Sequence, residues 1–513
     1  MCLNNGILKF LLSFILLFAS NLIGFSLKLD VCMINLLVAI ACFLAFVKCN
    51  RMNLCLALIV MIIITSAKLF GVETRLYAVF IWCAFLIGTV CLSKDFSKEN
   101  LSLMFIFGAV FFNLNFISIT GFDWVQYDIL SCYNYIEYII ENNFMFWNEN
   151  PLLTRPSYSA YHPILHFFIA GLGVKLAHVI SGNIEVANEV VQVVFLFYMF
   201  TFYIFANRII ALFNFDKLVH LTVLAFICFF PIFNAMSGYF NNDGLLLALQ
   251  CMSIYYALMY YKNSERKHLW LMVLSVILAC LTKLSGIVVL PMIGLILLVK
   301  LWNKREISYF YELCGAGVVI LLGVMIWPIY QHFMLGVSYN FVPPQEHLSL
   351  VSYSYWERFN PIKAVIYERM FYNDFGINLW ETMTKTALYG QWSLEIRASD
   401  IFALVKVLDF CYRIILCFIV GGFFWIACKK QNIIFYFICA LILGVLGAHV
   451  IFGIMHPYMC NMDFRYVAIL ILPMAIILGT ITERFSLLWR TLVASCIGVF
   501  AISSAIIWWW VVL

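Results

Sequence analysis

Charged residues are scarce in this chain. Asp, Glu, Lys and Arg make up only 11% of its 513 residues, against roughly 25% in an ordinary soluble domain. Hydrophobic residues make up 65%, and a soluble core of this length does not hide so much apolar surface. Apolar runs of about 18 residues or more recur from end to end, and each is long enough to cross a hydrocarbon core of about 30 Å. The composition excludes a soluble globular protein and predicts an all-α polytopic membrane protein.

The motifs of several protein classes are also absent. The sequence has no C-x-x-C pair, no Cys/His spacing of a metal site, no P-loop, no G-x-S-x-G and no H-E-x-x-H. These absences argue against a zinc site and against the enzyme classes that those motifs mark. The 18 cysteines lie mostly inside apolar runs, where a free thiol behaves as a small hydrophobe. The formal charge of +5 comes mostly from Lys and Arg in short loops, where they orient helices, so no nucleic-acid partner is expected.

The apolar runs predict about fifteen membrane-spanning helices. The first run lacks a signal-peptide cleavage site and is expected to span as well. The predicted spans are 7–26, 31–47, 54–71, 76–93, 101–118, 187–207, 217–236, 243–262, 268–282, 284–301, 313–334, 402–427, 433–453, 465–482 and 489–512.

The basic turns predict the orientation of these helices. The positive-inside rule places the N-terminus in the cytoplasm and the loop after the fifth span outside. The stretch 163–181 is short and carries His166, Lys175 and His178. If it spanned, the downstream basic clusters would lie outside, so we interpret it as an interfacial or re-entrant helix. The C-terminus is then outside.

This topology divides the chain into five parts and places the working face outside, because both long loops lie there. No internal repeat is visible, so the inverted symmetry of many transporters is not evident. The parts are 1–118 (N-terminal transmembrane helices), 119–186 (first outer loop with interfacial helices, catalytic), 187–335 (transmembrane helices), 336–400 (second outer loop) and 401–513 (C-terminal transmembrane helices).

The first outer loop is acidic and aromatic. Asp123 and Asp128 precede Tyr135 and Tyr138, and the spacing from Asp128 to these tyrosines fits one face of a short helix. A carboxylate at the membrane surface can act as a general base when it is held near an acceptor hydroxyl or amine. The alternative is that these carboxylates are solvated loop residues.

The end of this loop reads His162-Pro163-Ile164-Leu165. A proline suits the first turn of a helix, because its missing N–H costs nothing there. His162 would then lie just outside the helix start, where it could contact an anionic phosphate. The alternative is an ordinary interfacial histidine.

Two further polar groups interrupt apolar sequence. Asn242 and Asp243 open a predicted span, where the helix dipole favours a carboxylate, so a simple helix cap is the alternative interpretation of Asp243. Lys283 lies between two short apolar runs. A lysine in such surroundings is costly without a partner, which makes it a functional candidate, although snorkelling to the interface is the alternative.

The last group is His456, followed by Asp463 and Arg465 at the outer start of a late helix. Arg465 could make a bidentate contact with a phosphate. It could equally pair with Asp463.

In their order along the chain, these motifs resemble the GT-C class of polytopic glycosyltransferases. The closest likeness is to the protein O-mannosyltransferase and lipid A aminoarabinose transferase group. The resemblance covers about residues 119 to 482. The matching elements are Asp128, Tyr135 and Tyr138, His162-Pro163-Ile164-Leu165, Asn242-Asp243, the stretch Leu281 to Gly286, and Phe464-Arg465-Tyr466 with Pro473.

The resemblance implies a GT-C-like bundle that moves a sugar from a polyprenyl-phosphate carrier (undecaprenyl or dolichyl) to an acceptor on the extracytoplasmic face, with inversion. Such a carrier phosphate is a good leaving group, so the enzyme needs mainly a base and cations. The residues implied are Asp128, with Asp123 beside it, as the base; His162, Lys283 and Arg465 for the phosphate; and Asp243, Asn242, Tyr135, Tyr138 and His456 for orienting the substrates.

The sequence departs from the family pattern at two motif positions and in the four extra helices that precede the first outer loop. Ile164 replaces the second proline, and His162 stands where the aminoarabinose branch often has a lysine, which argues against that particular sugar. The family also implies no required cofactor, although Asp123 and Asp128 leave room for a divalent cation. The expected partners are a polyprenyl-phosphate sugar, membrane lipids and a lipid, glycan or protein acceptor.

Two other functions remain open at this stage. A transporter or flippase for a lipid-linked or small polar substrate predicts charges buried at mid-bilayer and two related halves. An oligosaccharide ligase shares the carrier chemistry but moves a preassembled glycan. The absence of a retrieval signal favours a bacterial inner membrane over an endoplasmic reticulum membrane.

Overall fold

The computed structural model describes most of the chain and is helical throughout that part. The described residues are 2–28, 30–46, 82, 85, 97–122, 129–145, 158–338, 346–364, 376–390, 402–428 and 433–510. Within them the only β-type pairing is an isolated bridge between Ser349 and Tyr458. The predicted all-α class is therefore confirmed. The predicted spans 54–71 and 76–93 (apart from Trp82 and Phe85), Asp123 and Asp128 lie outside the described residues.

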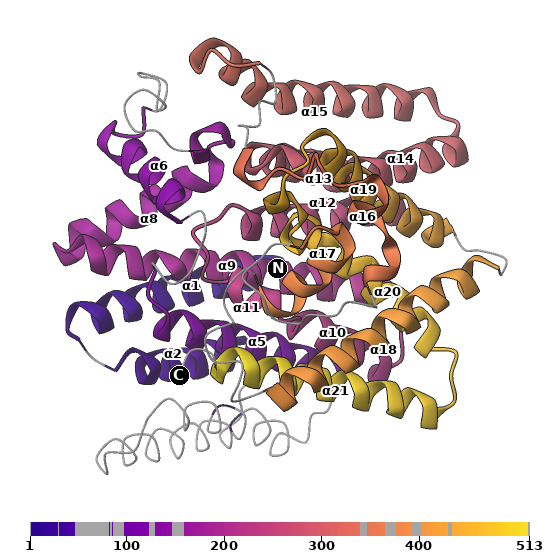
Figure 1. Cartoon of the computed structure of the whole chain (residues 1–513), viewed down its shortest axis with the longest axis horizontal. Helices are drawn as coiled ribbons and strands as arrows, with labels where there is room; N and C mark the ends of the chain where they lie inside the picture. The colour runs from indigo at the N-terminus through magenta and orange to yellow at the C-terminus, as the bar shows by residue number, and fades with distance from the viewer. Residues whose placement is uncertain are drawn as a thin grey trace.

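The long helices run side by side and form one bundle (Figure 1). In chain order the elements are α1 (Cys2–Ser26), α2 (Val31–Phe46), α5 (Lys98–Ile119), α6 (Ile129–Glu141), η1 (Tyr158–Tyr161), α8 (Leu165–Ser181), α9 (Ile184–Ala211), α10 (Lys217–Cys228), α11 (Ile232–Met236), α12 (Asp243–Asn263), α13 (Arg266–Thr282), η2 (Leu284–Val289), α14 (Leu290–Lys304), α15 (Ile307–Met334), η3 (Glu346–Leu348), α16 (Tyr355–Phe359), η4 (Pro361–Ala364), α17 (Leu379–Tyr389), α18 (Phe402–Ala427), α19 (Ile433–Met455), η5 (Met459–Met462), η6 (Phe464–Leu470), α20 (Ile471–Thr482) and α21 (Leu487–Trp510).

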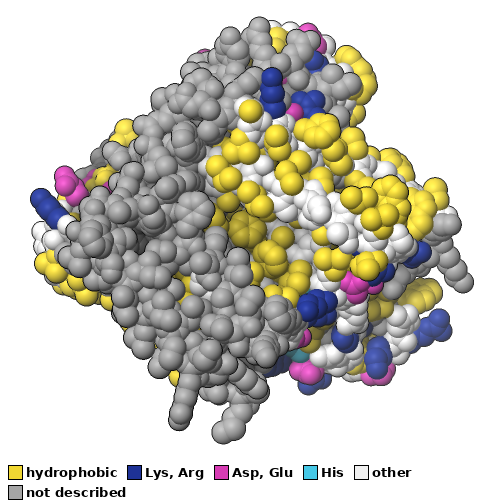
Figure 2. Space-filling view, turned by 90° about the horizontal axis from the view of Figure 1, so that it is seen from below, with side chains coloured by type: hydrophobic (Ala, Val, Ile, Leu, Met, Phe, Trp, Pro, Cys, Tyr) yellow, Lys and Arg dark blue, Asp and Glu magenta, His cyan; other side chains and the backbone are white. Residues whose placement is uncertain are grey.

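Nine helical segments in the described part are long and apolar enough to cross a membrane. Central helices such as α9 are mostly buried, whereas α15 leaves Leu321, Leu322 and Phe333 exposed. Figure 2 shows hydrophobic side chains over a broad area of one face, with Lys and Arg near its margins. An outer surface of this kind is stable in lipid and would aggregate in water. The chain is an integral, multi-pass membrane protein.

Three predicted helices are less regular than the sequence suggested. The span 217–236 is broken between α10 and α11, because Pro231 lacks the N–H that would continue the ladder. The spans 284–301 and 465–482 each begin with a 3₁₀ segment, η2 and η6, before the α-helix starts. Each 3₁₀ segment follows directly after a charged residue, Lys283 or Asp463.

Basic residues gather at one end of the bundle. Lys262 lies in the last turn of α12. There, Lys300 of α14 donates to the Ser264 hydroxyl at 2.7 Å, and Arg208 of α9 stacks on Tyr255. The start of α12 lies roughly 30 Å away, from a rise of about 1.5 Å per residue. The bundle therefore has a basic end, and the start of α12 at Asp243 lies toward the opposite end.

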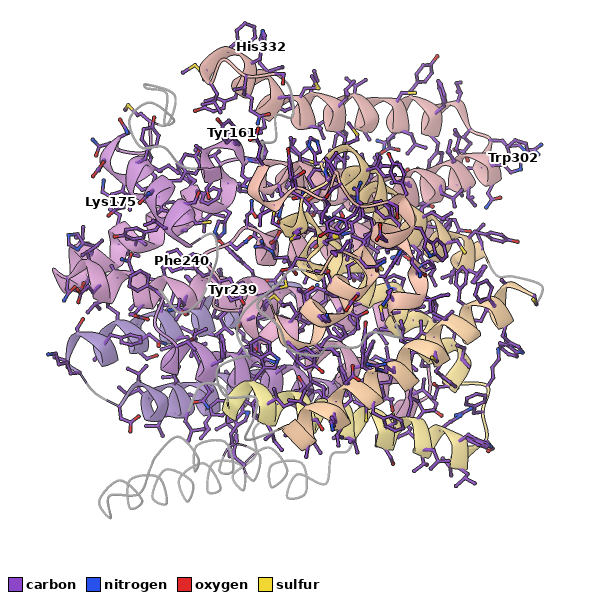
Figure 3. All side chains as sticks on the ribbon, in the orientation of Figure 1. Tyr161, Lys175, Tyr239, Phe240, Trp302 and His332 are labelled. Carbon is purple, nitrogen blue, oxygen red and sulfur yellow. The ribbon has the colours of Figure 1, made fainter. Side chains whose placement is uncertain are left out.

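Helix α8 extends the bundle at this opposite end. Gly182 ends α8 in the left-handed conformation, with φ of 67°, and the chain turns directly into α9. His166, near the start of α8, lies against Phe195 and Tyr198 in the middle of α9. Helix α8 thus covers the half of α9 that is remote from the basic end. Figure 3 accordingly places Lys175 of α8 and Trp302 of α14 on opposite sides of the molecule.

Candidate functional site

A cluster of four buried charges lies where α12 begins. The Asn242 side chain does not cap this helix; its amide instead donates to the Thr282 carbonyl at 3.1 Å. The Asp243 backbone N–H donates to the Asn241 side chain at 2.9 Å. The Asp243 carboxylate, only 2% exposed, is therefore directed at cations from two other elements. Asp243 lies in the first turn of α12, where the helix dipole favours a carboxylate, and its side chain bonds to Lys283 rather than to a backbone N–H of that turn.

The first cation is Lys283, at the break between α13 and η2. Its backbone is extended, with φ of −159°, because the chain leaves α13 here and starts a 3₁₀ turn. The Lys283 Nζ donates to Asp243 Oδ1 at 2.6 Å, and its side chain is 12% exposed. The snorkelling interpretation of Lys283 is therefore wrong. A partner carboxylate offsets the cost of placing this ammonium among apolar helices.

The second cation is Arg465, in the first turn of η6. Its Nη1 lies 3.6 Å from Asp243 Oδ2, and its Nε lies 3.6 Å from Asp463 Oδ2. The Arg465 backbone N–H also donates to Asp463 Oδ1 at 2.9 Å. Arg465 thus pairs with Asp463, one of the two partners that the sequence allowed, and also with Asp243, whereas its contact with a phosphate stays a prediction.

An aromatic ring joins the two cations. The Lys283 Nζ lies 4.4 Å from the centroid of the Tyr466 ring, and the Arg465 guanidinium lies 5.1 Å from it. Two cations and two carboxylates make the cluster electrically neutral when all four are ionised, which limits the penalty of burying them. We call Asp243, Lys283, Asp463 and Arg465 the charge cluster.

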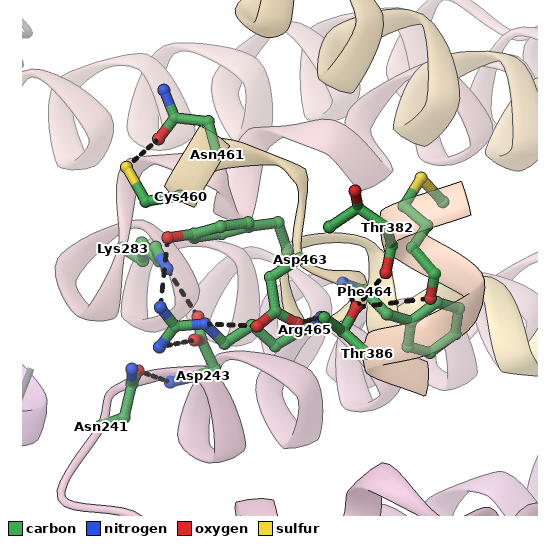
Figure 4. Close-up of polar contacts among 12 residues, drawn as sticks. Asn241, Asp243, Lys283, Thr382, Thr386, Cys460, Asn461, Asp463, Phe464 and Arg465 are labelled. Carbon is green, nitrogen blue, oxygen red and sulfur yellow. Dashed lines mark hydrogen bonds and ion pairs between the residues drawn. The ribbon is translucent and has the colours of Figure 1, made fainter. Parts of the chain in front are cut away.

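Helix α17, in the predicted loop 336–400, supports the charge cluster. Thr386 Oγ1 accepts the backbone N–H of Phe464 at 2.8 Å and itself donates to the Thr382 carbonyl at 2.8 Å. Figure 4 shows this contact beside Asp463 and Arg465. A loop element distant in sequence therefore fixes the start of η6. No sequence signal pointed to Thr386. Tyr466 could have been found, because it directly follows Arg465, which the sequence analysis had singled out.

The tyrosines of the first outer loop are buried together. Tyr135 and Tyr138 of α6 stack at 6.2 Å between ring centroids, and Tyr135 also packs on Phe167 of α8 at 4.9 Å. Burial raises the pKa of Tyr135 well above its ordinary value, so its hydroxyl stays protonated. Tyr135 therefore packs α6 on α8, and the stacking of Tyr135 with Tyr138 agrees with the predicted placement of both tyrosines on one helix face.

The remaining predicted residues lie apart from the charge cluster or outside the described residues. His162 is exposed at the turn after η1. Its neighbour Tyr161 is held by Trp327 and Gln331 of α15, which both donate to the Tyr161 carbonyl at 3.1 Å. His456 lies before η5, where its carbonyl accepts from Asn461. Asp123 and Asp128, the predicted bases, are not in the described part.

The sequence analysis named His166 only as one of the polar residues that argue against a membrane span over 163–181. It is fully buried, and neither ring nitrogen has a hydrogen-bond partner. Burial lowers the pKa of His166 to about 3, and the Asp243 carboxylate opposes that shift. The imidazole therefore stays neutral at physiological pH.

No group of three metal-ligating side chains occurs in the part of the chain that the structure describes. The described site is a cluster of two cations and two carboxylates. Lysine has three N–H donors, and Lys283 uses one of them on Asp243. Such a site can bind an anionic oxygen group such as a phosphate.

Comparison with known proteins gave structural matches only. No protein-family model matches the chain, and no curated protein matches it. Two solved structures of ArnT from Cupriavidus metallidurans are similar. The one bound to undecaprenyl phosphate shows 13% identity and a TM-score of 0.47, with 80% of this chain and 76% of that chain covered. The apo structure shows 14% identity and a TM-score of 0.37, with 76% and 72% covered.

Proposed function

We propose that this protein is a GT-C-type membrane glycosyltransferase. It takes a sugar from a polyprenyl-phosphate carrier and transfers it to an acceptor at the end of the bundle remote from the basic turns. The observation that carries the proposal is that Lys283 and Arg465 both form ion pairs with Asp243. Lys283 uses only one of its three N–H donors on Asp243, so its remaining donors are suited to the oxygens of a phosphate.

The location of the charge cluster supports the same function. Basic residues mark the cytoplasmic end of a membrane protein, so the start of α12 belongs to the extracytoplasmic face. A carrier lipid in the outer leaflet would present its phosphate at that depth.

The reaction proposed is an inverting displacement. Asp128 removes the proton of the acceptor nucleophile, which attacks the anomeric carbon as the bond to the carrier phosphate breaks. Lys283 and Arg465 take up the charge that develops on that phosphate. Asp243 holds both cations in place before the donor arrives, so little reorganisation is needed at the moment of reaction.

The test is release of free polyprenyl phosphate from a radiolabelled donor panel by the purified full chain in detergent. Lys283→Met is expected to lower turnover about a hundredfold, the usual effect of removing one donor to a developing anion. Arg490→Gln is the matched control, because it removes a partly buried cation that pairs with Asp216 at the basic end. Wild-type activity in Lys283→Met, or in Asp128→Asn together with Asp123→Asn, would overturn the proposal.

A further inference from the structure

Buried polar atoms without hydrogen-bond partners gather beside the charge cluster. They are both ring nitrogens of His166 and the hydroxyls of Tyr198 and Tyr135. The His166 and Tyr198 rings lie 5.9 Å apart, and Phe167 links His166 to Tyr135 at 5.1 and 4.9 Å. A Cβ placed on Gly244, the residue after Asp243, would lie 3.8 Å from the Tyr198 Cβ. These atoms therefore adjoin the start of α12.

Partnerless buried polar groups are rare, and each needs an explanation. A buried group that loses water and gains no protein partner destabilises the ligand-free fold. The surroundings of His166 are aromatic, with Phe167 and Phe195 against its ring, so phenylalanine would pack there without that cost. A histidine at this position is explained if a ligand provides its hydrogen bonds.

The chemistry of these atoms identifies the kind of ligand. A neutral imidazole has one donor and one acceptor nitrogen, and a phenol both donates and accepts. Hydroxyl groups of a sugar ring match this combination. Burial lowers the pKa of His166 to about 3, so it cannot balance a carboxylate. In the described part of the site, Asp243 and Asp463 already pair with cations, which leaves no spare partner there for an ammonium group.

We propose that His166 and Tyr198 bind the hydroxyl groups of the transferred sugar, and that this sugar is a neutral one. The assignment rests on the proposed function, since it places the sugar next to the carrier phosphate held at Lys283 and Arg465. The atoms are closed to solvent in the ligand-free chain, so sugar binding requires the aromatic side chains around His166 to move. Binding then satisfies groups that the empty site leaves unpaired.

The test separates the sugar from its carrier. Affinities of the full chain in detergent are measured for bare polyprenyl phosphate, for polyprenyl-phosphate glucose and for the matching glucosamine lipid. His166→Phe and Tyr198→Phe are expected to keep the affinity for bare polyprenyl phosphate and to lose about tenfold in affinity for the glucose lipid, since each removes hydrogen bonds to the sugar. The ligand-free unfolding temperature should stay the same or rise in His166→Phe.

Tyr260→Phe is the matched control. Its hydroxyl is also buried and unpartnered, but it lies near the end of α12 remote from Asp243, so neither lipid affinity should change. Unchanged glucose-lipid affinity in His166→Phe and Tyr198→Phe would overturn the sugar site while leaving the proposed function intact. So would a lower ligand-free unfolding temperature in His166→Phe, and wild-type preference for the glucosamine lipid would overturn the neutral class. If the wild type binds neither bare polyprenyl phosphate nor the glucose lipid, both proposals fail.

Discussion

At the scale of single residues, the charge cluster combines a large penalty for burying charges with a large gain from pairing them. Lys283 and Asp463 are 12% and 1% exposed, so each would be costly without its partner. Removing one member of a buried ion pair leaves the other charge uncompensated, which usually costs about 3–5 kcal/mol. Replacing both members by neutral groups costs much less. Stability and function should therefore respond differently to paired substitutions.

Lys283→Met is expected to lower the unfolding temperature of the purified protein strongly, because Asp243 is left beside Arg465 alone. Adding Asp243→Asn should recover part of that loss, since the uncompensated carboxylate is removed. Thermal unfolding in detergent measures both effects. Donor turnover should stay low in the double variant, because the phosphate-binding ammonium is still missing. A double variant less stable than both single variants would contradict the ion-pair account.

At the scale of elements, the charge cluster depends on two short segments, α17 and the 3₁₀ turn η2 that opens the candidate span Leu284–Lys304. Helix α17 holds the start of η6 through Thr386, and η2 sets the direction of Lys283. The glycine in η2 is required by close approach: a Cβ on Gly286 would lie 2.7 Å from the backbone of Ala279 and of Cys280. Neither α17 nor η2 contains a member of the charge cluster, yet each helps to position one.

Thr386→Val is expected to weaken donor binding several-fold, because Phe464 N–H loses its acceptor and the start of η6 loosens around Arg465. Thr386→Ser keeps the hydroxyl and should retain wild-type behaviour. Donor KM and kcat measured for both variants check this expectation. Equal KM values in Thr386→Val and wild type would exclude a positioning role for this hydroxyl.

Gly286→Ala is expected to push η2 away from α13 and to reduce both stability and donor turnover. A backbone atom at 2.7 Å cannot yield as the end of a flexible side chain does. The matched control is Gly294→Ala in α14, where an added Cβ meets nothing within 4 Å and alanine favours the helix. Unfolding temperatures that rank Gly286→Ala at or above the control would contradict the close-packing argument.

At the scale of the whole molecule, the two ends of the bundle differ in charge and in role. The turn between α8 and α9 lies at the end beyond the charge cluster, and the turn between α12 and α13 lies at the basic end. The positive-inside rule assigns the basic end to the cytoplasm. The proposed reaction requires the charge cluster to lie on the other side.

Cysteine labelling tests this orientation. Glu185→Cys, at the start of α9, should react with a membrane-impermeant maleimide on intact cells, and Lys267→Cys should react only after the membrane is opened. Both positions are exposed. The background should lack the native cysteines that are exposed in the described part of the chain, Cys314, Cys417 and Cys428. The reverse labelling pattern would place the charge cluster in the cytoplasm and remove the extracytoplasmic reaction.

The sequence determined the class of fold and much of the site. Apolar run length decides which segments can cross a bilayer, so the described long helices coincide with predicted spans, except where Pro231 breaks one. Lys283, Asp243 and Arg465 could also be singled out, because a charge within apolar sequence needs a partner.

Only the tertiary structure decided which partner each charge has. Asp243 and Lys283 are 40 residues apart, and no sequence pattern distinguishes a helix cap or a snorkelling lysine from the ion pair that they form. The contact of Thr386 with Phe464 and the partnerless nitrogens of His166 likewise arise from packing between distant elements. Hydrophobic periodicity is a local property of the chain, whereas the pairing of buried polar groups depends on how helices far apart in sequence meet.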